Sequence, residues 1–367
     1  GSGSAIAKLF KAESNLQLQT SCGAVTKNTV ALLVQPAAAN AMQMAGVPAY
    51  PTQLTAGGNF GVDSVRVSIL DAYGNLKTDY SGSVYFTSSD AQAVLTYHSG
   101  NQKLLSNGRF TFPGSDFLLK TSGQQTVTAH SGTLATVTSP VILVQAAAIA
   151  GFALEVGSTQ IAGKQFSLNV SSARDSYNTL ANGTIVVTAA SGGNPAPNQN
   201  SSATLTNIAV VNGAGSAAQV LVRAEGTTLR GTVQSNSSIV RTTSTITVLP
   251  GDLAYFDIAG APTQIAAGQF FPAAVTVKAY DPFGNLKTNY TGRIYFSATD
   301  ASAYFLNGQA NPYQYLPADN GSHTFSNANF RLNTPGTQTM VVRDVDSPTI
   351  QGSKSIEVSS IIIKRIY

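Results

Sequence analysis

The sequence predicts an all-β protein built from tandem β-sandwiches, and three observations lead to this fold class. Short runs of alternating apolar and polar residues recur along the chain, with Gly, Asn, Asp and Pro between them, which is the pattern of half-buried strands. No convincing amphipathic helix interrupts these runs. The 367 residues also carry an internal repeat, and a length of about 100–200 residues per domain allows two to four domains.

The internal repeat is defined by two markers that share one period. An Asp-led turn occurs as DAYGN from Asp71, as DSYNT from Asp175 and as DPFGN from Asp281, at spacings of 104 and 106 residues. The dipeptide Ala-Gly recurs at spacings of 106 and 105 residues, at 56–57, 162–163 and 267–268. Because two independent markers agree, we expect three tandem units of about 105 residues.

Each unit has the strand pattern of an immunoglobulin-like sandwich. VDSVRVSIL at 62–70 and GSVYFTS at 82–88 alternate apolar and polar residues, and short strands at such spacing in units of about 100 residues are typical of this fold. The segment AAANAMQMAG at 37–46 has helical propensity, but it aligns with strands of the other units. Tyr80 and Tyr290 follow two of the turns, and we expect them to pack or hydrogen-bond across the corner.

The ends of the chain resemble pieces of further units. The junctions VILVQAAAIAGFALEVG (141–157) and ITVLPGDLAYFDIAG (246–260) read as a last strand, a hinge and a first strand. VALLVQPAAANAMQMAG (30–46) has the same form, and IEVSSIIIKRIY (356–367) matches the junction residues ITVLPGDLAYFD (246–257). We therefore predict three tandem immunoglobulin-like β-sandwiches with extra strands at both chain ends. The domains are the end of an incomplete unit at 1–36, sandwiches at 37–146, 147–250 (divergent) and 251–358, and the first strand of a further unit at 359–367.

Two explanations of these ends stay open. In the first, the chain is a fragment of a longer repeat protein. In the second, subunits exchange strands, because an unpaired edge strand is a template for another chain and a donated strand completes a sandwich through main-chain hydrogen bonds. A head-to-tail contact of this kind does not close, so it would propagate a filament. The residues expected in such a subunit contact are Leu16, Leu18, Val30, Leu32, Val34, Ile361, Ile362, Ile363, Ile366 and Tyr367.

The repeated segments resemble a known family. VRVSILDAYGN, YSGSVYFTSSDAQAVL and FLLKTSGQQTVTA in the first unit correspond to VTVKAYDPFGN, YTGRIYFSATDASAYF and FRLNTPGTQTMVV in the third. This pattern resembles tandem immunoglobulin-like repeats of bacterial and archaeal surface proteins, which occur in filaments, surface layers and adhesins. The resemblance implies an extracellular or cell-surface location. It implies no ligand, because one fold serves many functions.

The repeated turn is the strongest candidate for a metal site, although a structural turn explains it better. Asp and Asn oxygens could bind Ca²⁺, but the same side chains hydrogen-bond their own backbone in turns, where Gly supplies a positive φ. The second unit lacks the Gly-Asn pair. We therefore predict no cofactor, with Ca²⁺ as the weaker alternative at Asp71, Asn75, Asp90, Asp281, Asn285 and Asp300.

Composition and motifs favour a structural protein over an enzyme. Charged residues make up 10% of the chain, against about 25% in an average soluble domain. The net charge of +4 comes without a basic cluster, so we expect no nucleic-acid binding. No apolar window is long enough for a membrane-spanning helix. The three histidines (His98, His130 and His323) match no ligand spacing, and the single Cys22 allows no internal disulfide.

The function predicted from the sequence is that of a structural subunit of an extracellular filament or cell-surface assembly, joined head-to-tail to copies of itself. The alternatives are an adhesin or carbohydrate-binding stalk that contacts surface glycans, and a spacer of a larger secreted protein. The Tyr-rich segment AYFLNGQANPYQYL at 303–316 is the best candidate for an exposed aromatic platform. In the spacer case, the partners are neighbouring immunoglobulin-like domains.

Overall fold

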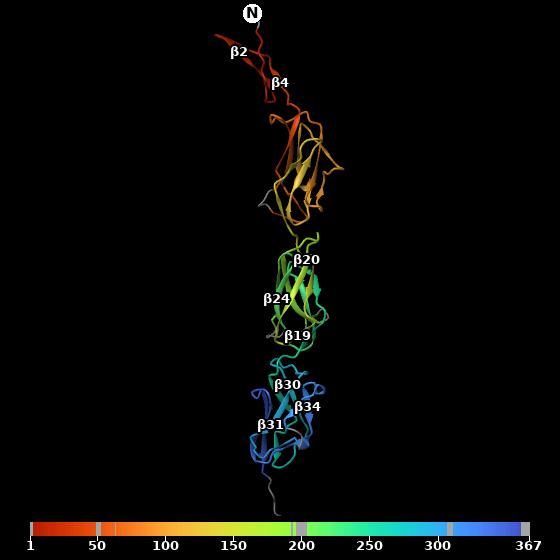
Figure 1. Cartoon of the computed structure of the whole chain (residues 1–367), viewed down its shortest axis with the longest axis vertical. Helices are drawn as coiled ribbons and strands as arrows, with labels where there is room; N and C mark the ends of the chain where they lie inside the picture. Colours follow the sequence, from red (N-terminus) through yellow and green to blue (C-terminus); the bar gives the residue numbers. More distant parts are fainter. Residues whose placement is uncertain are drawn as a thin grey trace, which may run out of the picture. The chain divides into compact units, whose positions relative to one another are not determined.

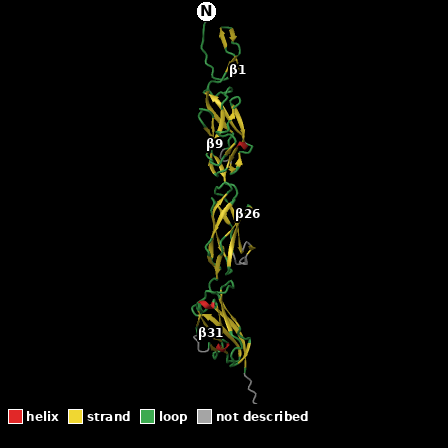
Figure 2. Ribbon diagram, turned by 90° about the vertical axis from the view of Figure 1, so that its right-hand side faces the viewer, coloured by secondary structure: helices red, strands yellow, loops and turns green. Residues whose placement is uncertain are grey.

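The computed structural model describes residues 3–48, 53–62, 64–191, 194–195, 204–306 and 311–360. Strands joined by loops make up nearly all of this part of the chain (Figure 2). The helical segments within it are short 3₁₀ turns at η1 (Gly114–Asp116), η2 (Pro317–Asp319) and η3 (Asn327–Asn329). The predicted all-β class, with tandem immunoglobulin-like sandwiches, is confirmed.

The chain divides into two compact units. The first comprises Gly1–Phe152, Ser172–Gly183 and Val211–Gly213, and the second comprises Ala153–Ser171, Thr184–Val210 and Ala214–Tyr367. These limits pass through the divergent repeat at 147–250. The predicted domain boundaries therefore stay predictions, and the three groups of strands below are named only for reference.

The N-terminal segment, residues 3–36, forms two small antiparallel pairs. The outer strands β1 and β4 pair with each other, and β2 and β3 form a hairpin. Figure 1 shows β2 and β4 in red, beyond the sandwich that follows in the same unit. The strands are β1 (Glu13–Leu16), β2 (Gln19–Cys22), β3 (Val25–Asn28) and β4 (Leu32–Val34).

The first sandwich contains β5 to β17, and its core follows from strict alternation. In β8 the side chains of Val65, Val67 and Ile69 are all 0% exposed, while the residues between them point away from the core. The segment with helical propensity forms β5. The strands are β5 (Ala39–Ala45), β6 (Gln53–Thr55), β7 (Gly58–Asn59), β8 (Ser64–Asp71), β9 (Ser83–Ser88), β10 (Val94–Leu95), β11 (Lys103–Leu104), β12 (Arg109–Pro113), β13 (Phe117–Leu119), β14 (Gly123–Gln125), β15 (Val127–His130), β16 (Val137–Thr138) and β17 (Ile142–Gln145).

The second sandwich contains β18 to β27. Its largest sheet has the path β19-β27-β25-β21-β22, and β20 pairs with β24 in another sheet. The strands are β18 (Gly151–Glu155), β19 (Thr159–Ile161), β20 (Gln165–Arg174), β21 (Gly183–Ser191), β22 (Asn194–Pro195), β23 (Ile208–Val210), β24 (Gly215–Val220), β25 (Gly226–Val233), β26 (Asn236–Thr242) and β27 (Ile246–Leu249).

The third sandwich contains β28 to β37, and its core again comes from alternating positions. Val275, Val277 and Ala279 of β30 are 0% exposed and join one apolar cluster with Phe296 and Phe330. The strands are β28 (Tyr255–Ala259), β29 (Gln264–Ala266), β30 (Val275–Tyr280), β31 (Arg293–Ala298), β32 (Tyr304–Phe305), β33 (Tyr313–Gln314), β34 (Ser322–Phe325), β35 (Phe330–Arg331), β36 (Gly336–Asp344) and β37 (Gln351–Ser359).

Tyrosines after two of the turns bond across the sandwich corner, as the sequence predicts. The Tyr80 hydroxyl lies 2.7 Å from Ser131 Oγ. The Tyr290 hydroxyl donates to Asp344 Oδ2 at 2.6 Å. Burial and the nearby Asp344 carboxylate raise the pKa of Tyr290 well above its usual range, so its hydroxyl stays protonated and keeps donating.

Candidate functional site

The repeated Asp-led turn is held by one carboxylate. Asp71 Oδ1 accepts hydrogen bonds from the backbone N–H groups of Tyr73 and Asn75, each at 2.9 Å. Asp71 Oδ2 accepts from the Asn75 side chain and from the Ala37 N–H, also at 2.9 Å. Gly74 takes φ +83°, which glycine adopts without the steric cost of a Cβ. The aspartate therefore ties the turn to the start of its own sandwich.

The third sandwich repeats this arrangement bond for bond. Asp281 Oδ1 accepts from the N–H groups of Phe283 and Asn285 at 2.9 Å. Asp281 Oδ2 accepts from the Asn285 side chain at 2.7 Å and from the Gly251 N–H at 2.8 Å. Such repetition over 210 residues indicates a scaffold element.

The asparagine of the turn reaches beyond its own sandwich. Asn75 Nδ2 donates to the Phe10 carbonyl at 2.7 Å, and Asn75 Oδ1 accepts from the Ala12 N–H at 3.0 Å. The ring of Tyr73 packs edge-on against Phe10, with 5.0 Å between centroids. One side chain thus satisfies a donor and an acceptor of the N-terminal segment, and we call this arrangement the asparagine clamp.

The same clamp joins the third sandwich to the loop before β25. Asn285 Nδ2 donates to the Val222 carbonyl at 2.7 Å, and Asn285 Oδ1 accepts from the Ala224 N–H at 2.9 Å. The clamped loops read LFKAES at 9–14 and LVRAEG at 221–226. The N-terminal segment is therefore equivalent to the end of the second sandwich.

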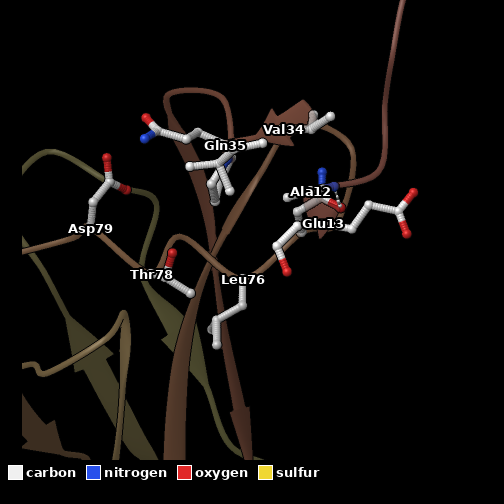
Figure 3. Close-up of a pocket in the computed structure, with 11 residues that line it drawn as sticks. Ala12, Glu13, Val34, Gln35, Leu76, Thr78 and Asp79 are labelled. Carbon is white, nitrogen blue, oxygen red and sulfur yellow. Dashed lines mark hydrogen bonds between the residues drawn. The ribbon is translucent and has the colours of Figure 1, made fainter. Parts of the chain in front are cut away.

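Each clamp borders a shallow pocket. Figure 3 shows the first pocket, in which Ala12 and Glu13 of the N-terminal segment lie near Leu76 of the turn. A matching pocket borders Asn285. The first is lined by residues 12–14, 33–36, 75–76 and 78–79, and the second by residues 223–226, 247–250, 285–286 and 288.

The turn of the second sandwich makes a different junction. Thr179 stands where the other turns have asparagine, and it donates to Asp175 through both its N–H (2.9 Å) and its hydroxyl (2.7 Å). Its short side chain has no second group to reach outward. Instead, Gln92 Nε2 of the first sandwich donates to the Tyr177 carbonyl at 3.1 Å.

The two sequence markers contact each other at these junctions. A Cβ on Gly57 would lie 2.0 Å from the Tyr177 hydroxyl oxygen, and a Cβ on Gly163 would lie 2.3 Å from the Phe283 ring. Both glycines also have a positive φ, of +81° and +78°. The glycine of each Ala-Gly dipeptide therefore leaves the space in which the aromatic residue of the following turn packs.

The N-terminal segment also shares an internal hydrogen-bond pair with complete sandwiches. The Leu18 N–H donates to Thr29 Oγ1 at 3.0 Å, and the Thr29 N–H returns a bond to the Leu18 carbonyl at 2.8 Å. The same reciprocal pair joins Val127 with Ser139, and Leu229 with Thr243. These pairs align the three segments residue by residue.

The aligned apolar residues differ in burial. Leu18, Leu32 and Val34 are only half-buried in the N-terminal segment. Their counterparts are 0–3% exposed in the first and second sandwiches, at Val127, Ile142, Val144, Leu229, Ile246 and Val248. Of the other predicted contact residues, Leu16 is half-buried and Val30 is 82% exposed. The residues Ile361, Ile362, Ile363, Ile366 and Tyr367 lie outside the described residues.

β4 also has a free edge that its counterparts lack. β17, β27 and β37 each carry a short parallel strand on one side, which is β6, β19 and β29 respectively, in addition to an antiparallel neighbour. In the described residues, β4 pairs only with β1. Within the described residues, the N-terminal segment therefore presents a partly buried apolar face and one unpaired strand edge.

The weak calcium candidates are all engaged in hydrogen bonds. Asp90 Oδ2 accepts from the N–H groups of Lys120 and Thr121, and Asp90 Oδ1 accepts from the Gln92 N–H and the Thr121 hydroxyl. Asp300 makes the equivalent bonds to the loop at 333–334. Within the described ranges, no three His, Cys, Asp or Glu side chains come close enough to hold a metal. Calcium binding stays an untested prediction.

The aromatic segment at 303–316 contributes mainly to the core. Tyr315 is 1% exposed and donates to the Val277 carbonyl at 2.7 Å. Tyr304 and Tyr313 are half-buried, and Tyr313 bonds to His323 at 2.8 Å. The described tyrosines of this segment therefore do not form the exposed platform that the carbohydrate-binding alternative needs.

Acid is expected to destabilise the chain through its buried turn aspartates. Burial alone would raise the pKa of Asp71, but hydrogen bonds from the Asn75 side chain and from three backbone N–H groups outweigh it and lower the pKa to about 2. Hydrogen bonds likewise outweigh burial and lower the pKa of Asp90, Asp175 and Asp300. An unfolded aspartate titrates near pH ~3.9, so stability is present above that pH and is lost as pH falls toward about 2.

Melting temperatures measured by circular dichroism from pH 7 to pH 2 test this expectation. They should stay level down to about pH 5 and fall steeply below about pH 4. The Asp71→Asn variant should show a smaller fall, because it has one fewer such carboxylate. A melting temperature that does not change down to pH 2 would contradict the assignment.

Comparisons with known proteins give likenesses of structure only. No protein-family model matches the chain, and no curated protein matches it in sequence. Among solved structures, the Escherichia coli adhesin FdeC is 16% identical, with a TM-score of 0.45 over 87% of this chain and 96% of the adhesin. Invasin, a bacterial integrin-binding protein, is 16% identical, with a TM-score of 0.32 over 87% of this chain and 60% of its own.

Domains 4–9 of the surface layer protein SbsC are 16% identical, with a TM-score of 0.28 over 89% of this chain and 48% of theirs. At these identities and scores, the likenesses do not identify what this chain binds or assembles with. In the described residues, no helix has the length and apolar character to cross a membrane.

Proposed function

We propose that the chain is a structural subunit of an extracellular or cell-surface assembly, joined head-to-tail to further copies by strand pairing at its ends. The observation that carries the proposal is the N-terminal face of Leu18, Leu32 and Val34, which is only partly buried where the aligned residues are fully buried. Apolar area left open to water favours association, and the free edge of β4 offers main-chain hydrogen bonds to a partner strand.

The composition supports the location in this proposal. Few charges and many Ser, Thr, Asn, Gln and Gly residues suit extracellular sandwiches, in which Thr and Val fit a half-buried pleated surface. The asparagine clamps suit a load-bearing subunit, because they fasten a sandwich to the loop before it. The partner strand proposed from the sequence is the isoleucine-rich segment at 361–367 of the next copy.

Deletion of residues 361–367 is expected to abolish self-association while leaving the fold intact. The full chain should form concentration-dependent oligomers or filaments in light scattering and negative-stain images, and the truncated chain should stay monomeric. A Lys364→Ser variant serves as the control, because that position aligns with the exposed Ala150. Normal polymerisation of the truncated chain would exclude this donor strand.

A spacer role in a longer protein is the alternative that the same face allows. In that case, residues of the same polypeptide would cover Leu18, Leu32 and Val34, and no self-association would depend on residues 361–367. A full chain that stays monomeric at every concentration tested would favour the spacer.

A further inference from the structure

The loop at the end of a sandwich occurs in two forms. Three equivalent hydrogen bonds fix its start, because Gly57, Gly163 and Gly268 donate to the carbonyls of Leu119, Leu221 and Leu332 at 2.7–2.8 Å. From that leucine, the first and third sandwiches have the five-residue loops LKTSG and LNTPG. The second sandwich and the N-terminal segment have the six-residue loops LVRAEG and LFKAES.

The five-residue loop is held by its own sandwich. Asp90 Oδ2 accepts from the N–H groups of Lys120 and Thr121 at 2.6 and 2.9 Å. Asp300 Oδ2 does the same for the next such loop, with Asn333 at 2.6 Å and Thr334 at 3.0 Å. Each aspartate also accepts from the threonine hydroxyl at 2.6 Å. The backbone N–H groups of the five-residue loop are therefore hydrogen-bonded within their own sandwich and need no partner from the sandwich that follows.

The six-residue loop is held by the sandwich that follows. Its alanine N–H, at Ala12 or Ala224, donates to the clamping asparagine, and the carbonyl two residues earlier accepts from it. Three of these four bonds are partly buried, and an N–H or C=O shielded from water without a partner is costly. The turn that follows this loop therefore needs a side chain with both a donor and an acceptor, which asparagine supplies.

The last residue of the Asp-led turn correlates with the length of the loop that precedes it. Asn75 and Asn285 follow six-residue loops, and Thr179 follows the five-residue loop of the first sandwich. Threonine makes the bond to the turn aspartate that asparagine also makes, at 2.7 Å in both the second and third sandwiches. Threonine lacks the outward amide, and the loop before it has its donors already satisfied.

We propose that the end loop determines which sandwich can follow it. A six-residue loop selects a turn with asparagine, and a five-residue loop held by its own aspartate selects a turn with threonine. By this rule, the end of the third sandwich, with Gly268, Asp300 and Thr334, is a docking surface for a sandwich of the second type, whose turn carries Tyr and Thr as at 175–179. Gly268 has φ +79°, like the two glycines that seat an aromatic residue. Naming this partner goes beyond the head-to-tail function, because residues 3–36, the segment proposed to meet the end of another copy, contain no such turn. The selection rule itself stands on the three junctions within the chain.

A double-mutant cycle in the full chain tests the rule. One change replaces Lys120-Thr121-Ser122 by Val-Arg-Ala-Glu, which installs the six-residue loop at the end of the first sandwich, and the other is Thr179→Asn. Alone, Thr179→Asn should lower the melting temperature, because it places an amide against satisfied donors. In the loop-replaced chain, the same substitution should raise it by several degrees, and hydrogen exchange of residues 119–124 should slow.

Equal effects of Thr179→Asn in the two backgrounds would overturn the rule, as would unchanged exchange. If the loop-replaced chain does not fold, the reverse cycle decides. It replaces Val222-Arg223-Ala224-Glu225 by Lys-Thr-Ser, and Asn285→Thr should then cost less than it does in the unmodified chain. An equal cost in both would again overturn the rule. None of these measurements depends on self-association. A failure of head-to-tail assembly would therefore leave the selection rule intact, and a failure of the rule would leave the assembly intact.

Discussion

Replacement of Asp281 by alanine is expected to lower the free energy of unfolding by about 3–5 kcal/mol. The carboxylate is 0% exposed. It accepts from the backbone N–H groups of Gly251, Phe283 and Asn285 and from the Asn285 amide. Each buried donor left unpaired costs roughly 1–3 kcal/mol, and relaxation of the turn recovers part of that sum. Urea unfolding of the full chain, followed by tyrosine fluorescence, measures the loss.

Asp252→Ala is the matched control for this prediction. Asp252 lies next to Gly251, but its side chain is 77% exposed and pairs with the exposed Lys164. Its replacement should change stability by less than about 0.5 kcal/mol. The conservative Asp281→Asn should fall between the two, because it keeps one acceptor oxygen. If Asp281→Ala and Asp252→Ala unfold at the same urea concentration, the turn aspartate does not hold the sandwich together.

The sequence predicts the turn well, but it does not predict the hydrogen bonds that the asparagine of the turn makes to the N-terminal segment. Asp, Gly and Asn at these spacings already indicate a turn closed by its own side chains, and Asp71, Gly74 and Asn75 take those roles. The outward partners of Asn75 are a backbone carbonyl and a backbone N–H, at Phe10 and Ala12. Backbone groups leave no signature in residue type. The similarity of LFKAES to LVRAEG is the signal that would have found the clamp.

The Ala-Gly marker shows a second limit of sequence-based prediction. Gly57 and Gly163 indicate a repeat, but their role depends on the ring of the next turn lying where a Cβ would be. That proximity joins residues about 120 positions apart in sequence (Gly57 to Tyr177, Gly163 to Phe283). Only the structure shows that the Ala-Gly marker and the Asp-led turn contact each other. Because the aromatic ring lies where a Cβ would be, glycine is the residue that fits at this position of the marker.

The degree of exposure of the N-terminal segment does not follow from its sequence. Leu18, Leu32 and Val34 have the alternation of a buried sandwich strand, and the repeat predicts them in a subunit contact without saying how much of each side chain is exposed. Their partial exposure shows that the described residues supply only one side of that core. The clamp explains how such an incomplete segment stays ordered. Asn75 fixes its loop through two hydrogen bonds, and Tyr73 packs on Phe10.

Leu32→Asp is expected to weaken self-association at least about tenfold while leaving the sandwiches folded, because a carboxylate at this position would have to be desolvated when a partner covers the face. Leu32 lies in β4 opposite Leu16 and is half-buried. Sedimentation velocity over a range of concentrations gives the association constant, and the melting curve shows whether the fold is kept.

Leu33→Asp is the control that distinguishes an effect on the apolar face from a general effect of a charge in β4. Leu33 is the next residue of β4, points to the opposite side and is 67% exposed. Both variants add the same charge to the same strand and cost the same strand propensity. Only Leu32→Asp places that charge among the residues whose aligned counterparts are buried in complete sandwiches. Equal association constants for the two variants would mean that this face stays open in the assembly, and the contact would then have to lie elsewhere on the chain.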